Sequence, residues 1–373
     1  MRLRALVPAL AAFALSSLPS SGQAGLFSSD DESTVAALLE RLPATDWSKE
    51  TGGFSVVDIA LLRQALGVEW PQTWPTRDDA GSEAMRAIVS VVTLMPVPPQ
   101  AIATLRYDMH EAPLALLGLD VLRVDAIAER GFGRPSGSSS VLVGPALADT
   151  AAVSAALGAP DRLGPGEIPV WVPEDAAWRG PLSGSSLALV APDHVAILGA
   201  DTAIDDGIAA ADGHGGAIAA LPEAAALIEV AEATAGRLVA LWGLHPGVLR
   251  SVMNVPESGW PADAELPEFQ ALGAAWAVDG GQAVSRLMLV YADAAAAEKA
   301  RQAMTDRMPL LEFRGDVTVS AISVTEAAGM PVVVIESRAA LPTIGDRQPL
   351  TGFHIWTRRL FVMLDIRFLE PTL

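Results

Sequence analysis

The sequence predicts an α+β protein, with mostly antiparallel sheets backed by alanine-rich helices and arranged as two related halves. Three observations carry this prediction. Short apolar segments are separated by turn residues, which is typical of β-hairpins. Alanine-rich segments with apolar residues at helical spacing follow these pairs. The order of hairpin and then aspartate-led helix occurs twice, in residues 186–211 and again in residues 271–304.

The first elements are a strand that runs into a helix, and then more helix. In TGGFSVVDIALLRQALGV, residues 51–68, Ile59, Leu62 and Leu66 have the spacing of one helix face. The segment EAMRAIVSVVTLM, residues 83–95, predicts another helix, which PVPP ends. Residues 112–131 predict a pair of helices, the second of which ends at a glycine.

Strands then alternate with helices up to residue 211. The predicted strands are 139–144, 168–173, 186–192 and 194–199, and the predicted helices are 148–158 and 200–211. The last two of these strands form a hairpin across Pro192-Asp193.

The same pattern returns after residue 270. Strands 271–279 and 283–291 meet at Asp279-Gly280-Gly281, a tight-turn signal, and residues 292–304 form the helix behind them. Further strands are predicted at 317–324, 331–337, 352–359 and 360–369. We therefore expect an N-terminal α+β domain at residues 25–244 and a C-terminal α+β domain at residues 245–373.

The N-terminus has the layout of a secretory signal peptide. MRLR is followed by the apolar ALVPALAAFALSSL and by small residues in SSGQAG. Residues 1–24 are therefore expected to be cleaved, which predicts a periplasmic or secreted protein. No cysteine follows that could take a lipid anchor, and no later apolar run approaches the roughly 18 residues of a membrane span. We thus expect no integral membrane span.

Composition excludes several classes of partner and chemistry. The formal charge of the 373-residue chain is −19, and loss of residues 1–24 removes Arg2 and Arg4 and no acid, which gives −21. Such a chain repels phosphate backbones, so nucleic acid is not an expected partner. The complete absence of cysteine excludes disulfides, thiol nucleophiles and thiolate zinc sites.

Three aspartates at the starts of predicted helices require an explanation. Asp149, Asp201 and Asp293 each stand in an ADTA or ADAA segment behind a strand. An aspartate at the N-cap accepts hydrogen bonds from the free N–H groups of the first turn, and removing it costs about 0.5–2 kcal/mol. The alternative is a cation site, but the neighbours are alanine and threonine and not further oxygen donors. We interpret all three as caps, and predict no metal site.

Catalytic motifs are absent from the sequence, which also suggests no cofactor. There is no G-x-S-x-G, H-E-x-x-H, Walker loop or S-x-x-K, and GFGRPSG at residues 131–137 does not follow a strand. The five histidines, at positions 110, 194, 214, 245 and 354, are scattered singly. Acid pairs such as Asp205-Asp206 are common in so acidic a chain and are first expected to be solvated.

Two tryptophans are the most specific candidates for ligand binding. Trp70 and Trp74 lie in VEWPQTWP, and Trp260-Pro261 repeats the dipeptide. If exposed, the rings could stack on a sugar or on a proline-rich segment. If buried, they would fix a long loop to the body of the protein. Burial is favoured, because large rings are on average highly buried.

Several segments resemble a loose group of uncharacterised exported proteins and lipoproteins of high-GC bacteria. The similarity lies in VVDIALLRQALG, LGLDVLRVDAIAERG, SVLVGPALADTAAVSAALGA, IPVWVPED, LALVAPDHVAILGADTAIDDGIAAA and SRLMLVYADAAAAEKARQAM, over most of residues 52–310. The resemblance implies an exported α+β protein and brings no activity or site residues. This chain departs from the group in lacking the cysteine that anchors many of its lipoproteins.

These observations favour an exported, non-catalytic envelope or secreted protein that binds another macromolecule or a small ligand. One alternative is a periplasmic solute-binding protein, which two halves with a cleft between them would indicate. The other is a metal-independent hydrolase that uses Asp or Glu together with His194 or His214.

Overall fold

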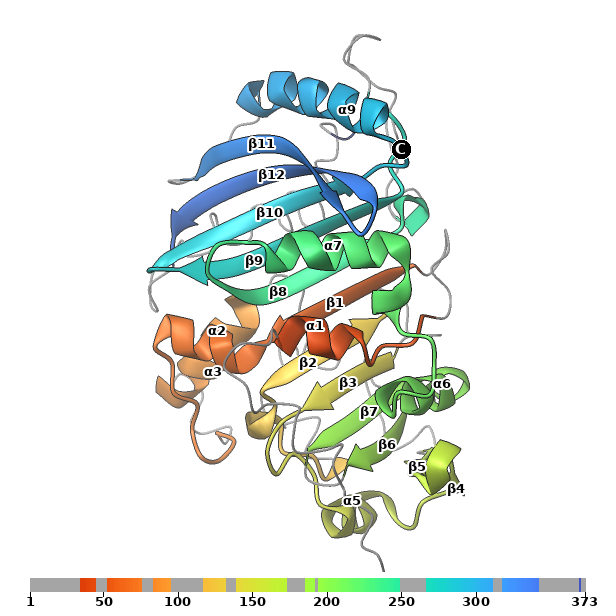
Figure 1. Cartoon of the computed structure of the whole chain (residues 1–373). Coiled ribbons are helices and arrows are strands. Elements are labelled where there is room, and N and C mark those ends of the chain that lie inside the picture. The colour runs from red at the N-terminus through yellow and green to blue at the C-terminus, as the bar shows by residue number, and fades with distance from the viewer. Residues whose placement is uncertain are drawn as a thin grey trace, which may run out of the picture. The chain divides into compact units, whose positions relative to one another are not determined.

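The computed structural model (Figure 1) is an α+β protein with one large antiparallel sheet, as the sequence predicts. The structure describes residues 34–44, 52–75, 83–94, 117–131, 139–172, 185–191, 194–248, 266–310, 317–341 and 369. The relationship between the two predicted halves stays a prediction.

The described chain contains twelve strands and the helices that cover them. The strands are β1 (Gly53–Asp58), β2 (Ala126–Arg130), β3 (Ser139–Val143), β4 (Arg162–Leu163), β5 (Pro169–Trp171), β6 (Ser185–Ala191), β7 (Val195–Ala200), β8 (Arg237–Leu244), β9 (Ala271–Asp279), β10 (Gln282–Val290), β11 (Thr318–Ala327) and β12 (Met330–Ala340). The helices are α1 (Thr34–Leu39), α2 (Ile59–Leu66), α3 (Glu83–Leu94), α5 (Thr150–Leu157), α6 (Asp201–Ala211), α7 (Pro222–Glu232) and α9 (Ala294–Arg307), with short 3₁₀ helices η3 (Val121–Arg123), η4 (Pro165–Glu167), η6 (Ile218–Ala220) and η8 (Met308–Leu310).

All twelve strands belong to one sheet in the order β11-β12-β10-β9-β8-β1-β2-β3-β7-β6-β5-β4, and every pair is antiparallel. The predicted domain boundary at residue 245 falls between β8 and β9. These two strands are hydrogen-bonded neighbours, with Leu244 opposite Leu272. The sheet is therefore continuous across the boundary in the described residues.

Each face of the sheet carries its own hydrophobic cluster under helices. On one face Leu62 of α2, Ile88 of α3, Val153 of α5 and Met304 of α9 pack into a single buried cluster. We call this the α9 face. Because both faces of most strands are covered, the strands are apolar in nearly every position rather than in alternate positions.

The opposite face, here named the α7 face, is covered by α1, α6 and α7. Leu38, Ile204 and Leu227 from these helices belong to its cluster. Figure 1 shows α7 crossing in front of β8 and β9. The two hairpin-plus-helix units therefore differ, since α6 packs on the α7 face and α9 packs on the other.

Most predicted elements are confirmed. The strand-to-helix transition at residues 53–66, the helix at 83–94, the strands β3, β5, β6, β7, β9, β10, β11 and β12, and the helices α5, α6 and α9 all form. The tight turn at Gly280-Gly281 joins β9 to β10 as expected, with φ of 53° and 86°. The described residues do not include the predicted strand at 352–359, residues 360–368 of the strand predicted at 360–369, residues 132–137 of GFGRPSG, or His110, His354 and Trp260. The expectation that GFGRPSG does not follow a strand is wrong, because Gly131 comes directly after β2, which ends at Arg130.

The predicted helix pair at residues 112–131 is wrong in its second half. Residues 126–130 form strand β2, which pairs with β1 and β3 in the middle of the sheet. Ile127 packs into the α9-face cluster, whereas Ala126 and Ala128 pack into the α7-face cluster. An alanine-rich segment that is buried on both faces has no alternation to identify it, and pairing with two neighbours overrides its helical propensity.

One of the three predicted aspartate caps is also wrong. Asp149 caps α5 by accepting from the backbone N–H of Ala151 at 2.7 Å, and Asp293 caps α9 through Ala296 at 2.8 Å. Asp201 instead is the first residue of α6, and the cap residue before it makes no side-chain hydrogen bond. Its carboxylate accepts a 3.0 Å hydrogen bond from Arg162.

A further aspartate cap is present that the sequence analysis did not identify. Asp58 ends β1 and caps α2, with its Oδ1 accepting from the N–H of Leu61 at 2.7 Å. The cap turns the chain sharply from strand to helix. As a consequence the side chain of Leu62 packs on the α9 face of the sheet.

Candidate functional site

The two predicted ligand-binding tryptophans lie against the core. Trp70 is 6% exposed and belongs to the α9-face cluster, and Trp74 is half-buried against the same cluster. The guanidinium of Arg63 stands 4.8 Å from the centre of the Trp70 ring. This arrangement fits the anchoring interpretation, because little of the Trp70 ring is available for stacking. A ligand-binding role for the pair stays a prediction.

The described histidines lie apart from one another, and no described group of three His, Asp or Glu residues could hold a metal ion. His194 is exposed at the end of the β6–β7 hairpin. His214 Nδ1 lies 2.9 Å from Asp212 Oδ2, with 76% of the histidine side chain exposed. His245 Nδ1 accepts a hydrogen bond from the N–H of Gly247, which closes a local turn.

The acidic residues of α6 form an ion-pair cluster. Arg162 donates to Asp205 at 2.8 Å and to Asp201 at 3.0 Å, and these hydrogen bonds raise the pKa of Arg162. The cluster ties β4, at one end of the sheet, to the helix beside it. All three side chains are 31% or more exposed, so the attraction is screened by solvent. We therefore assign this cluster a structural role.

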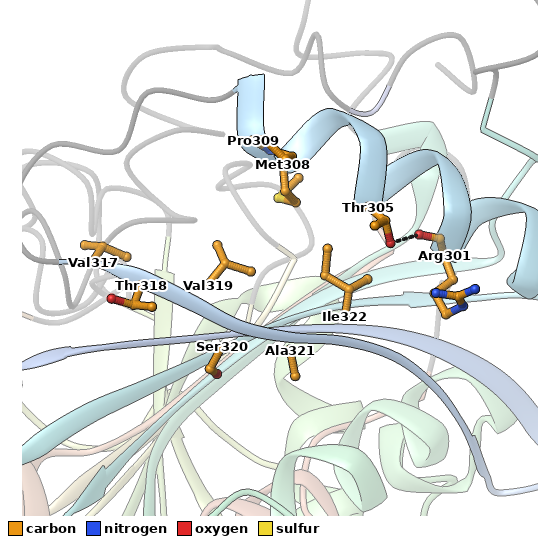
Figure 2. A pocket seen from close by; sticks show the side chains of 10 residues that line it. All are labelled: Arg301, Thr305, Met308, Pro309, Val317, Thr318, Val319, Ser320, Ala321 and Ile322. Carbon is orange, nitrogen blue, oxygen red and sulfur yellow. Dashed lines mark hydrogen bonds between the residues drawn. The ribbon is translucent and has the colours of Figure 1, made fainter.

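A groove between α9 and β11, which we call the α9 groove, is a feature suited to binding (Figure 2). Its volume is about 620 Å³. The apolar side chains that line it are Met308, Pro309, Val317, Val319 and Ile322. Figure 2 shows Val319 and Ile322 directed from β11 toward the helix, while Ser320 and Ala321 point away from it.

A β-bulge explains why the neighbouring side chains of Ser320 and Ala321 point to the same face of β11 (Figure 2). The register with β12 shifts between Val319 and Ala321, so that Ser320 is an extra residue. The bulge restores the alternation afterwards, with Ile322 and Val324 again packed against the α9-face cluster. It therefore keeps the wall of the α9 groove apolar on both sides of the shift.

Polar groups stand at the rim of the α9 groove. Arg301 on α9 is held by Glu298 one turn earlier, with 2.6 Å between Nη2 and Oε1. This hydrogen bond raises the pKa of Arg301 and lowers the pKa of Glu298. The hydroxyl of Thr305 donates to the carbonyl oxygen of Arg301 at 2.8 Å, as Figure 2 shows. The groove thus combines an apolar wall with a solvent-exposed, charged edge.

A second cavity lies on the other face of β11, under α7. We call it the α7 pocket, and its volume is about 270 Å³. Its polar side chains include Glu229 on α7 and the cross-strand pair Arg286 and Glu336. Ala321, Ser323 and Thr325 of β11 line it as well. The two cavities therefore flank the same strand.

The pair in the α7 pocket is part of a larger hydrogen-bond network. Arg286 Nη2 lies 3.0 Å from Glu336 Oε2, and Arg286 Nη1 donates to the carbonyl oxygen of Val230 at 2.8 Å. Glu336 Oε1 accepts from Arg338, which is in turn 3.5 Å from Asp279. Burial raises the pKa of Glu336, but the hydrogen bonds and charges of the two arginines outweigh it, so that its pKa is lowered.

This arrangement is suited to binding rather than to a specific reaction step. The two cavities hold hydroxyl groups, carboxylates and guanidinium groups whose hydrogen bonds are with each other or with the backbone. The sequence predicts β11 and α9 as elements but indicates no site on them. The one available signal was the strand TVSAISVTEA, which has a single charged residue and alternates small hydroxyl and β-branched side chains.

Comparisons with known proteins identify no family. No family model matches the chain, and no curated protein matches it. Among solved structures, crystal form III of TP0453 is similar with a TM-score of 0.40 and 11% identity, over 81% of this chain and 93% of that one. Crystal form I of TP0453 gives a TM-score of 0.38 and 10% identity, over 81% and 92%. A likeness of this degree defines neither a family nor a function for this chain.

None of the described helices combines the length and the apolar composition that a bilayer crossing requires.

Proposed function

We propose that this protein is an exported, non-catalytic binding protein of the cell envelope or the extracellular medium, and that β11 with its two flanking cavities is the binding surface. The signal-peptide pattern of residues 1–24 supports export. The observation that carries the binding role is the α9 groove, an open cavity of about 620 Å³ with an apolar wall and a polar rim. Binding sites commonly combine an apolar lining with a few polar groups that orient the ligand.

The periplasmic solute-binding alternative depends on a cleft between two halves. At the predicted boundary β8 and β9 are paired through seven registered positions, from Arg237 to Leu244. No observation therefore favours that alternative over the α9 groove. The hydrolase alternative has one relevant contact, His214 with Asp212, and both side chains are largely exposed in a loop.

Isothermal titration against cell-wall glycans and against fractionated envelope extracts tests the proposal. The protein variants are Ile322→Glu, which places a charge in the apolar wall, and Leu163→Glu as the matched control. Leu163 lies on β4 at the opposite end of the sheet and is 62% exposed. We expect heat of binding with the unmodified protein and with Leu163→Glu, and its loss with Ile322→Glu. The absence of any heat of binding with every ligand class would overturn the proposal.

A further inference from the structure

The outermost strand of the described sheet leaves one backbone edge without a neighbouring strand. β11 is the last strand in the sheet order, and it spans ten residues. Within it only Ala327 is buried. Proteins usually protect such an edge with charged or proline residues, because its free N–H and C=O groups pair readily with another strand. Apart from its bulge, β11 has only one of these devices, Glu326 near its end.

Both faces of this edge strand are lined by cavities. Side chains of β11 alternate between the α9 groove, entered by Val319 and Ile322, and the α7 pocket, entered by Ser323 and Thr325. A strand added beside β11 would alternate in the same way, because successive side chains point to opposite faces. Its side chains would therefore face the two cavities in turn.

The two cavities differ in the side chains that they accept. The α9 groove offers an apolar wall. The α7 pocket is lined by the carboxylates of Glu229 and Glu336 and by one guanidinium, and the guanidinium of Arg286 is already paired with Glu336. Glu229 accepts a hydrogen bond from the backbone N–H of Ala328 and makes no ion pair in the described part of the chain. The excess charge on this face is thus negative.

We propose that β11 binds an extended segment of another protein by strand addition, and that the segment alternates apolar and basic residues. This inference rests on the proposed function and specifies its partner. Main-chain hydrogen bonds to β11 supply affinity, and the alternate side chains supply specificity. The apolar residues enter the α9 groove, and the basic residues face Glu229 and Glu336 in the α7 pocket.

The test uses fluorescence anisotropy with a fluorescein-labelled ten-residue peptide of alternating valine and lysine. The matched control peptide has glutamate in place of each lysine. We expect the lysine peptide to bind about tenfold or more tightly than the glutamate peptide at low salt, because cross-strand opposite charges attract and like charges repel. Equal binding of the two peptides would overturn the inference.

Two variants test the position and the charge separately. Ile322→Glu should weaken the lysine peptide by about tenfold, while Leu163→Glu at the other end of the sheet should not change its affinity. Glu229→Gln, which removes a negative charge from the α7 pocket and keeps an acceptor for the N–H of Ala328, should reduce the preference for the lysine peptide. Circular dichroism and thermal unfolding verify that each variant is folded. Unchanged affinities in both Ile322→Glu and Glu229→Gln would contradict strand addition at β11.

Two outcomes separate this inference from the proposed function. If neither peptide binds, but a glycan or an envelope fraction gives heat that Ile322→Glu abolishes, the inference is overturned and the binding function stands. If no ligand of any kind binds, both are overturned. Sedimentation that shows a dimer lost in Ile322→Glu would also overturn the inference, because a second copy would then occupy the edge.

Discussion

The carboxylate of Glu229 on α7 accepts a 2.7 Å hydrogen bond from the backbone N–H of Ala328, in the turn between β11 and β12. These residues are 99 positions apart in the chain. The turn has Ala328 at φ 47° and Gly329 at φ 74°, and a two-residue turn with both angles positive is the type that favours Asn-Gly. Glu229 therefore holds the outer hairpin in a conformation that alanine alone disfavours.

Replacing Ala328 with asparagine should stabilise the protein. An alanine in the left-handed region costs about 1–2 kcal/mol, which asparagine lowers because its side chain tolerates that conformation. We expect a gain of about 1 kcal/mol in the free energy of unfolding, measured by urea denaturation. Glu229→Gln on the same background provides the control, since an amide oxygen still accepts the hydrogen bond. A loss of stability in Ala328→Asn would show that the turn is not strained.

Replacing Gly273 with alanine should destabilise the packing of α7 on the sheet. A Cβ at Gly273 would lie 2.7 Å from Leu227 Cδ2 and 3.0 Å from the backbone oxygen of Trp242. Overpacking of this kind costs about 1–3 kcal/mol. Because the closest atom belongs to Leu227, the double variant Gly273→Ala and Leu227→Ala should lose less stability than the sum of the two single variants. Strict additivity would contradict the close approach.

The ion pair of Arg286 and Glu336 predicts a pH dependence. The folded pKa of Glu336 is lower than in the unfolded chain, so the pair adds stability above pH about 4.5 and loses it as the pH falls through the folded pKa. Glu336→Gln should cost about 1–3 kcal/mol at pH 7 and progressively less as the solution is made more acidic. Urea denaturation at pH 7, 5 and 3.5 measures both effects. A constant difference over this range would refute the assignment.

The two confirmed caps, Asp149 and Asp293, should contribute more to the free energy of unfolding than Asp201 does. Asp149→Ala and Asp293→Ala each remove a hydrogen bond to a free helix N–H and should cost about 0.5–2 kcal/mol. Asp201→Ala removes an exposed ion pair with Arg162 and a long, 3.4 Å hydrogen bond from the hydroxyl of Ser186, and about 0.2–1 kcal/mol is expected for the ion pair. Thermal unfolding of the three variants measures the order. If Asp201→Ala were the most costly, the distinction between cap and ion pair would fail.

Trp70 should matter for stability more than for binding. Its ring is almost fully buried, so Trp70→Ala should cost about 3–5 kcal/mol, and the half-buried Trp74 should cost less. Denaturation measures the stability, and titration against glycans at a temperature where the variants are folded measures binding. A variant that keeps its stability but loses glycan binding would show that the substituted tryptophan contacts the ligand.

The sequence predicted most elements because they are local. Hairpins such as residues 271–290 carry their own turn residues and need no distant partner for recognition. Strand β2 was predicted as a helix because its alanine-rich segment shows no alternation when both faces are buried. Neither α7 nor β8 was assigned at all, although together they form the centre of the α7 face.

The candidate site could not be predicted from local pattern. The α9 groove exists because α9 and β11, two elements expected from sequence, leave a space on one face of the sheet. That space depends on the strand order, which places β11 at the end beyond β12. The Glu229 contact with Ala328 depends on α7, which the sequence analysis did not assign.

Strand β1 can complete its pairing only late in synthesis, because one of its two neighbours in the sheet, β8, lies far along the chain. Most neighbouring strands are close in sequence, but Val57 of β1 pairs with Ala240 of β8. Contacts of such long sequence separation form late and slow the folding of a domain. During synthesis β1 therefore waits for residues 237–244, and until then one of its edges can pair with other chains. A truncated chain that lacks β8 should consequently aggregate.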